Sequence, residues 1–307
     1  YQTNEIKNIA LLGNDGSGKT TLTESLLYEA GVIQRRGRVS QGTTVSDYFP
    51  VEQDYGYSVF STVYHVEYNN KKLNIIDCPG SDDFVGAAIT ALNVTDTAVL
   101  LLNGQYGPEV GTQNHFRYTE KLKKPVIFLV NQLDSEKCDY ANVLERLKDI
   151  YGPKVVPVQY PLNEGPEFNS LIDVLLMKKL TYTGEGQPPI VEDIPAEEYE
   201  KAKALHMELV EKAAENEEGL MDKFFESEEL TTDEIRMGAR LGLETDSVYP
   251  VLCCSASTDV AVSRLLEFLA NVAPEITDMP QPVDADGETV PYNSEAPTSI
   301  FFYKTSV

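Results

Sequence analysis

The pattern of hydrophobic and polar residues predicts strands that alternate with helices over the first 160 residues. Residues 6–12 form a short apolar run typical of a buried strand, and a glycine-rich turn separates them from residues 20–30, where leucines recur at helical spacing. Further strands are predicted over 59–68, 73–77, 97–102, 125–130 and 155–159, and helices over 110–122 and 140–151. Because this alternation is typical of a mostly parallel sheet with helices on both faces, we expect an α/β fold.

The pattern changes after about residue 160. Residues 192–248 hold 18 acidic and 6 basic side chains, a net charge of 6 − 18 = −12, which is half of the −24 of the whole chain. Amphipathic helices are predicted over 195–218, 220–225 and 232–243, and the first pattern then returns with a strand over 249–254 and a helix over 260–272. We therefore expect an α/β domain over 1–160 and 249–273, interrupted by an acidic, helical or α+β insert over 161–248.

Two stretches lack a clear periodic pattern. Residues 32–49 are rich in Gly, Thr and Ser and are predicted to form a loop. Residues 274–297 contain five prolines and are predicted to be a linker. Residues 298–307 begin a new strand; because a strand without a partner is not a domain, we expect the natural protein to continue.

Composition limits the possible functions. The pI near 4.4 argues against free binding to DNA or RNA backbones. No apolar run approaches the roughly 18 residues of a membrane span, and the first residues do not form a signal peptide. The four cysteines match neither a disulfide framework nor a zinc spacing, so we expect a cytoplasmic protein.

The strongest motif is a phosphate-binding loop. The sequence Gly13-Asn14-Asp15-Gly16-Ser17-Gly18-Lys19-Thr20 matches G-x-x-x-x-G-K-[ST] between a predicted strand and a predicted helix, which is the context that the motif requires. Backbone N–H groups and the helix N-terminus would bind phosphate oxygens. Lys19 would bind the β- and γ-phosphates, and the Thr20 hydroxyl would bind Mg²⁺. Contacts are expected from Asn14, Asp15, Gly16, Ser17, Gly18, Lys19, Thr20 and Thr21. The alternative is a glycine-rich turn that contains a lysine by chance.

Two further motifs follow predicted strands. In Asp77-Cys78-Pro79-Gly80, Asp77 can hold Mg²⁺ through water and Gly80 lets a backbone amide approach the γ-phosphate, although D-x-P-G alone is a common turn. Asn131-Gln132-Leu133-Asp134 looks like the guanine-reading N-K-x-D motif, in which the Asp134 carboxylate accepts N1–H and the exocyclic amine. Gln132 replaces the usual lysine, so we expect weaker nucleotide affinity; the alternative is an ordinary polar loop.

A last pair of residues, Ser255-Ala256, ends the final strand and resembles the loop whose backbone amide contacts guanine O6. The four motifs, in this order around an acidic insert, resemble a translational GTPase, above all elongation factor G. Residues 42–59 align without a gap to the first switch of that family, and they share Gly42, Asp47, Glu52, Gln53 and Gly56. Residues 107–118 resemble a helix start of the family, 193–230 its inserted subdomain, and 298–305 the first strand of its second, β-barrel domain.

The resemblance implies a GTP- and Mg²⁺-binding domain of a factor that moves messenger RNA and transfer RNAs through the ribosome. It implies Thr20, Ser58 and Asp77 as metal-binding residues, Ser58 standing for the switch threonine. At Ser81, however, the family has the histidine that orients the attacking water. Serine is too short to replace it, and Asp15, Gly16 and Tyr57 also differ from the family around the γ-phosphate. We therefore expect GTP binding with weak or absent hydrolysis.

Several alternatives stay open. The chain could be an active ribosome-dependent GTPase with a substituted catalytic group, although the nearest candidate, Asp82, would add negative charge beside a triphosphate. It could be a ribosome-protection or regulatory protein, or a nucleotide kinase, for which 131–134 and Ser255-Ala256 would be coincidences. Arg35, Arg36 and Arg38 could contact ribosomal RNA and the acidic insert a ribosomal stalk protein, or both could be solvated surfaces.

Overall fold

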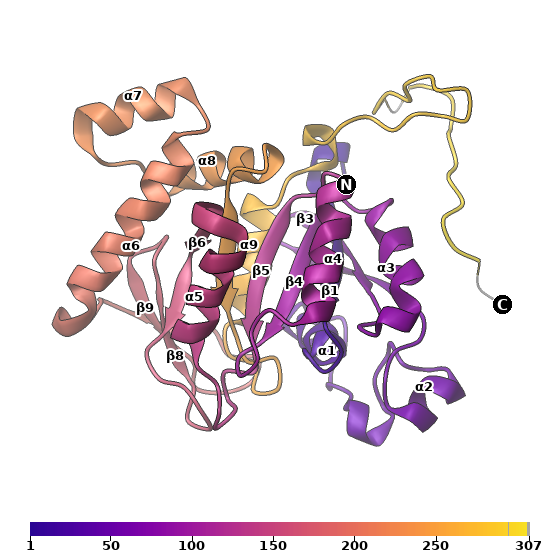
Figure 1. Cartoon of the computed structure of the whole chain (residues 1–307), viewed down its shortest axis with the longest axis horizontal. Coiled ribbons are helices and arrows are strands. Elements are labelled where there is room, and N and C mark those ends of the chain that lie inside the picture. Colours follow the sequence, from indigo (N-terminus) through magenta and orange to yellow (C-terminus); the bar gives the residue numbers. More distant parts are fainter. Residues whose placement is uncertain (294, 306–307) are drawn as a thin grey trace.

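A seven-stranded sheet forms the centre of the computed structural model, which describes residues 1–293 and 295–305 (Figure 1). The strand order is β2-β3-β1-β4-β5-β11-β6, and every neighbouring pair is parallel except β2 and β3. The strands are β1 (Ile6–Gly13), β2 (Thr62–Tyr68), β3 (Lys71–Asp77), β4 (Thr97–Asn103), β5 (Val126–Asn131), β6 (Val155–Pro157) and β11 (Tyr249–Cys253). The predicted mostly parallel sheet is confirmed.

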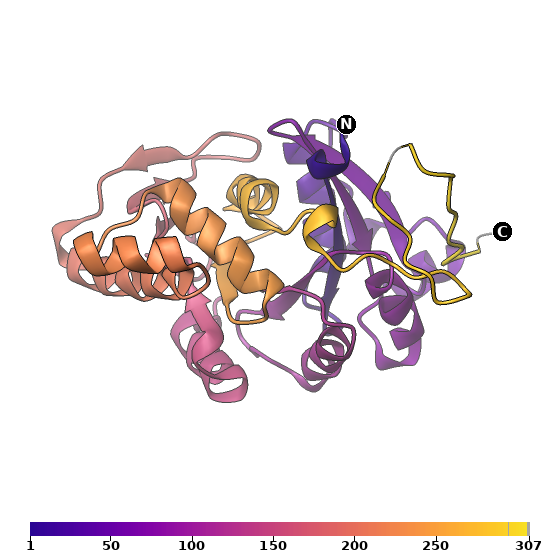
Figure 2. The same ribbon diagram turned by 90° about the horizontal axis from the view of Figure 1, so that it is seen from above.

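Helices cover both faces of this sheet, as predicted. Figure 2 shows α9 on one side of the strands and α4 and α5 on the other. Helix α1 packs beside α9, and α3 packs beside α4. The helices are α1 (Lys19–Glu29), α3 (Val85–Leu92), α4 (Val110–Lys121), α5 (Tyr140–Tyr151) and α9 (Val262–Val272).

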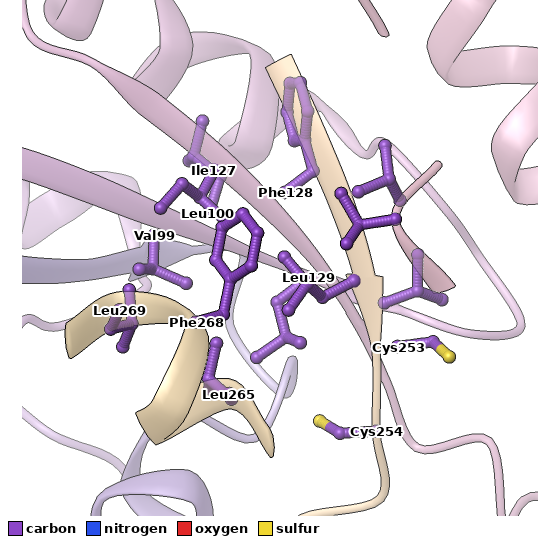
Figure 3. Packing of buried hydrophobic residues seen from close by; sticks show 14 of the residues in the cluster. Val99, Leu100, Ile127, Phe128, Leu129, Cys253, Cys254, Leu265, Phe268 and Leu269 are labelled. Atoms are coloured by element: carbon purple, nitrogen blue, oxygen red, sulfur yellow. The ribbon is translucent and has the colours of Figure 1, made fainter. Parts of the chain in front are cut away.

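The central strands are buried on both faces, which explains their continuous apolar runs. Leu265, Phe268 and Leu269 of α9 lie against the sheet (Figure 3). On the opposite face Phe128 of β5 stacks with Phe116 of α4, with 6.0 Å between ring centroids. The carboxyl ends of β1, β3, β5 and β11 are thereby fixed, and the candidate site residues follow these ends.

A second, four-stranded antiparallel sheet lies beside the first and was not predicted. It has the order β10-β9-β8-β7 and consists of β7 (Gln159–Pro161), β8 (Ser170–Asp173), β9 (Lys178–Thr181) and β10 (Ile190–Glu192). The single strand predicted over 155–159 is two strands, because Val158 donates its N–H to Val251 and accepts at its carbonyl from Val174. The backbone therefore passes from the central sheet to the second sheet at Val158.

The predicted helices of the acidic region are present as α6 (Ala196–Ala214), α7 (Glu218–Ser227) and α8 (Thr232–Glu244). Among the described residues, no helix has both the length and the apolar character that a membrane crossing requires.

Two parts of the chain differ from the expected pattern. A short helix, α2 (Pro50–Tyr55), follows the predicted loop; it begins with proline and ends at Gly56 with a φ of 71°. The predicted strand over 298–307 is absent from its described part, 298–305, where Phe301 and Phe302 are exposed. A strand needs a hydrogen-bonding partner, and this extended segment pairs with none (Figure 1). Residues 294, 306 and 307, within the expected linker and strand, lie outside the described residues.

Candidate nucleotide-binding site

The phosphate loop connects β1 to α1 and surrounds the Lys19 ammonium. Gly18 caps the helix with a φ of 91°, a conformation that favours glycine. The Nζ of Lys19 donates to the carbonyl oxygens of Gly13 and Asn14 at 3.0 and 2.9 Å. Burial lowers the pKa of Lys19, and the nearby Asp77 carboxylate opposes that shift. The loop therefore holds a buried cation at the N-terminus of a helix, which is an arrangement suited to phosphate.

A pocket of about 230 Å³ opens beside this loop. Its lining brings together residues from the phosphate loop, the first switch, the segment after β3 and the segment after β5: Asp15, Gly16, Gly18, Lys19, Thr20, Thr21, Val39, Asp47, Gly56, Tyr57, Ser58, Gly80 and Gln132. Ser17 is buried beneath the loop. Asn14 lies close to Gly111 of α4, so its side chain is directed toward that helix.

Three of the pocket residues and Asp77 form a compact group of oxygen atoms. Thr20 Oγ1 lies 3.1 Å from Ser58 Oγ and 3.2 Å from Asp77 Oδ2, and Ser58 donates to Asp47 Oδ1 at 2.8 Å. The other Asp77 oxygen, Oδ1, is buried and has no protein partner. Burial raises the pKa of Asp77 to about 7, and the neighbouring Asp47 adds to the shift while Lys19 opposes it.

These oxygens fit a magnesium ion that is bound together with phosphate. Mg²⁺ prefers small oxygen ligands and usually binds through one or two carboxylates plus substrate phosphates. The unpartnered Asp77 oxygen and the two hydroxyls match that description. In the parts of the chain described by the structure, no group of three or more acidic, His or Cys side chains could hold a metal alone. Phosphate oxygens of a bound nucleotide would complete the ligand set of such an ion.

The side chain of Asn131 joins the phosphate loop to the loop after β11. Its Nδ2 donates to Ser17 O at 2.9 Å, and its Oδ1 accepts from the Ala256 N–H at 3.0 Å. A Cβ atom on Gly18 would lie only 2.5 Å from that Nδ2, so the loop position requires glycine. The predicted base-reading residues are therefore assembled around one buried amide.

Asp134 and Gln132 complete this end of the site. Asp134 accepts from the hydroxyls of Ser255 and Ser257, at 2.7 and 2.5 Å. Gln132 has a φ of 64° and donates from Nε2 to Gly16 O at 2.9 Å, so its side chain lies across the phosphate loop. Its Oε1 accepts from Asn103. The glutamine thus keeps a contact between the two loops without the charge of a lysine.

The segment after β3 approaches the lysine closely. A Cβ atom on Gly80 would lie 2.5 Å from Lys19 Nζ, which explains the need for glycine there. Ser81 is not part of the pocket lining. Its Oγ accepts from the Asp83 N–H at 3.3 Å and caps the short turn of Asp82–Phe84, and Asp82 accepts from Asn114. The serine hydroxyl is thus engaged by its own turn.

Four residues of the site were not predicted. Glu24 accepts from the Gly37 and Val45 N–H groups, and His115 Nδ1 accepts from the Gly13 N–H at 3.3 Å. Asn103 donates to Gln132, and Ser257 donates to Asp134. Burial lowers the pKa of His115 to about 4, so the ring is a neutral acceptor. Glu24 lies one helical turn after Thr20, a spacing that could have shown it faces the first switch. Nothing in the sequence marks His115.

A parallel sheet with a buried lysine in a glycine turn, and an Asn-x-x-Asp loop beside it, defines a P-loop nucleotide-binding domain of the GTPase type. The family model of the Elongation factor Tu GTP binding domain matches residues 4–275. The chain belongs to this family of GTP-binding translational GTPases.

A solved structure is similar to this chain over most of its length. The chain is 34% identical to the protein ttk003000868 from Thermus thermophilus, with a TM-score of 0.83, and the match covers 90% of this chain. It covers 41% of the Thermus chain, so the present sequence spans less than half of that protein's length.

Proposed function

We propose that the chain binds GTP with Mg²⁺ as the nucleotide-binding part of an elongation factor G-like protein, which promotes movement of messenger RNA and transfer RNAs through the ribosome in the cytoplasm. The observation that carries the proposal is the Asn131 amide, which joins Ser17 of the phosphate loop to Ala256 of the loop after β11, residues 255–257, named the base loop. The similarity of residues 42–59 to the first switch of elongation factor G supports the specific assignment.

In this proposal, each group of residues has one task. Backbone groups of Asn14–Thr21 and Gly80 bind the phosphates together with Lys19. Thr20, Ser58 and Asp77 hold Mg²⁺, which would neutralise phosphate charge. Asp134 accepts from guanine N1–H and its amine, and the Ala256 N–H, which donates to Asn131 Oδ1, is shared with guanine O6 in a three-centre hydrogen bond. Asn131 and Gln132 connect the Asn131–Asp134 loop to the phosphate loop, and Ser255 connects Asp134 to the loop after β11.

We further propose that hydrolysis is weak or absent, because nothing at Ser81 can orient water as an imidazole does. The Ser81 hydroxyl accepts a hydrogen bond from the Asp83 N–H. Tyr57 lines the pocket, and the centroid of its ring lies 6.4 Å from that of Phe84. Loss of a water-orienting group costs several powers of ten in rate in other GTPases. Binding residues are therefore kept while the residue for water activation is missing.

The test is ribosome-stimulated GTP turnover by the full-length protein, compared with its Ser81→His and Ser81→Ala variants. We expect very slow turnover by the unmodified protein, no change with alanine, and a rise of at least about tenfold with histidine. Turnover comparable to ordinary elongation factor G, or a large loss with alanine, would show that hydrolysis is retained and depends on Ser81 or on another group.

The organisation of the longer protein is also a proposal. Residues 1–160 and 249–273 would form the GTPase domain, 161–248 its insert, 274–297 a linker, and 298–307 the start of a β-barrel domain. The insert would contact the ribosomal stalk protein, and the exposed Arg35 and Arg38 would contact ribosomal RNA, whereas the Arg36 guanidinium is bound within the protein. Charge reversal at Glu208, Glu211 and Glu215 tests the first contact: unchanged stalk binding would identify the acidic surface as solvated only.

A further inference from the structure

The segment that follows α1 sends one arginine side chain into the base loop. Arg36 Nη1 donates to the carbonyl oxygen of Ala256 at 2.8 Å, and Nη2 donates to that of Ser257 at 3.1 Å. The Arg36 side chain is only 13% exposed. By contrast, Arg35 and Arg38 are exposed, and within residues 1–293 and 295–305 their side chains make no hydrogen bond or ion pair. The three arginines therefore do not form one equivalent basic cluster.

Other groups hold the Arg36 guanidinium in this position. Ser25 Oγ accepts from Nη1 at 2.9 Å and itself donates to Ala256 O at 2.7 Å. Glu185 forms an ion pair with Nη2, and the Tyr28 ring lies 6.0 Å from the guanidinium carbon. A hollow of about 740 Å³ beside the contact is lined by Thr21 and Ser257 as well as Arg36, so the contact lies at the edge of the nucleotide site. A planar guanidinium with several fixed donors suits such a set of acceptors.

The position of the Ala256 carbonyl affects the direction of the Ala256 N–H. Both groups flank the same Cα, so two donors on the carbonyl restrict rotation of the backbone that aims the N–H. That N–H donates to Asn131 Oδ1 at 3.0 Å in this structure, and it is the group assigned above to guanine O6. A donor fixed in advance contributes more to recognition than a mobile one, because less entropy is lost on binding.

We infer that Arg36 is a positioning residue for base selectivity: it holds the Ala256 N–H where guanine O6 binds, and thereby connects the segment between α1 and the first switch to base recognition. The inference rests on the proposed GTP binding. It goes beyond it in assigning selectivity at the 6-position of the base to a side chain outside the Asn131–Asp134 loop.

The experiment compares binding of three Mg²⁺-nucleotides to the chain by calorimetry. GTP has O6 and the exocyclic amine, ITP keeps O6 but lacks the amine, and 6-thio-GTP keeps the amine but has a weakly accepting sulfur in place of O6. The variants are Arg36→Ala, Arg36→Lys and Arg36→Gln, with Arg35→Ala as the control. A thermal melt of each variant shows that it is folded.

We expect Arg36→Ala to weaken GTP and ITP binding by about tenfold each and 6-thio-GTP binding by less than about threefold, because only the O6 contact depends on Arg36. Arg36→Lys should recover part of the loss, since it keeps the charge but not the planar fork. Arg35→Ala should leave each of the three affinities unchanged.

Equal losses for all three nucleotides in the folded Arg36 variants would overturn the inference, because a merely structural role weakens every ligand alike. The same loss with Arg35→Ala would overturn it too. Failure of the unmodified chain to bind GTP would overturn the proposed function and this inference with it, so the two failures are distinguishable.

Discussion

Gly18 lies where the phosphate loop, the start of α1 and the Asn131–Asp134 loop meet. Its φ of 91° gives the phosphate loop its turn, and its missing side chain leaves room for the Asn131 amide. Gly16 also has a positive φ, 72°, but a Cβ atom there would meet nothing within 4 Å. Substitution of Gly16 by alanine would therefore add backbone strain alone, whereas substitution of Gly18 would add both strain and a clash with Asn131.

We expect Gly18→Ala to lower the free energy of unfolding by about 2–4 kcal/mol, because it adds backbone strain and displaces a buried amide. GTP affinity should fall by at least about 100-fold, since the Asn131 contact aligns both loops. Calorimetry and urea denaturation measure the two effects.

The matched control is Gly16→Ala, for which only strain of about 1–2 kcal/mol is expected. Equal effects of the two substitutions on GTP affinity would show that the Asn131 contact does not organise the site.

Two buried carboxylates, from helices α1 and α2, fix the segment between α1 and β2, which contains the first switch. Glu24 of α1 accepts from the N–H groups of Gly37 and Val45, at 2.7 and 2.6 Å, and so closes the loop between them. Glu52 of α2 accepts from the N–H groups of Val59 and Phe60, both at 3.0 Å. Carboxylate contacts to backbone N–H groups are among the stronger hydrogen bonds in proteins, so the segment is fixed by the protein itself.

We expect Glu24→Ala to loosen this segment, because two backbone N–H groups lose a charged acceptor. The rate of tryptic cleavage after the arginines at 35, 36 and 38 should rise by at least about tenfold. Limited proteolysis followed by mass spectrometry locates the cuts. Glu145→Ala, on the exposed side of α5, should leave cleavage unchanged. If both variants resist trypsin equally, Glu24 does not hold the switch.

Local patterns predicted the elements of the central sheet, because strands such as β4 and β5 are apolar runs and α5 has a clean helical period. The phosphate loop was also predictable, since its glycines and Lys19 are adjacent in sequence. The second sheet was missed because β7 to β10 have only three or four residues each. The contacts of Arg36 with Ala256 and Ser257 could not be predicted, because they join residues far apart along the chain.

At the scale of the whole molecule, a buried ion pair joins the second sheet to the central domain. Arg264 of α9 donates to Asp173 of β8 at 2.5 Å, and the two side chains are 6% and 0% exposed. Asp173 also accepts from Gln159 Nε2 at 3.3 Å and from the Leu176 N–H at 2.8 Å. The carboxylate is therefore satisfied on both oxygens. Its removal would leave the buried Arg264 guanidinium with Glu267, on its own helix, as its remaining ion-pair partner.

We expect Asp173→Ala to lower the free energy of unfolding by about 2–3 kcal/mol, because buried donors of Arg264, Gln159 and Leu176 lose their acceptor while Glu267 still balances the Arg264 charge. Urea denaturation measures the change. The matched control is Asp193→Ala, which removes an exposed pair with Lys178 and should leave stability nearly unchanged. Similar effects of the two substitutions would show that the buried pair does not hold the sheets together.

Equilibrium binding of GTP and ATP to this chain, measured by calorimetry with Mg²⁺ present, shows whether the site selects guanine. A site that pairs the guanine edge with Asp134 and the Ala256 N–H should bind GTP and reject ATP by at least about 100-fold. No uptake of GTP by the folded chain, or equal affinity for the two nucleotides, would contradict the account.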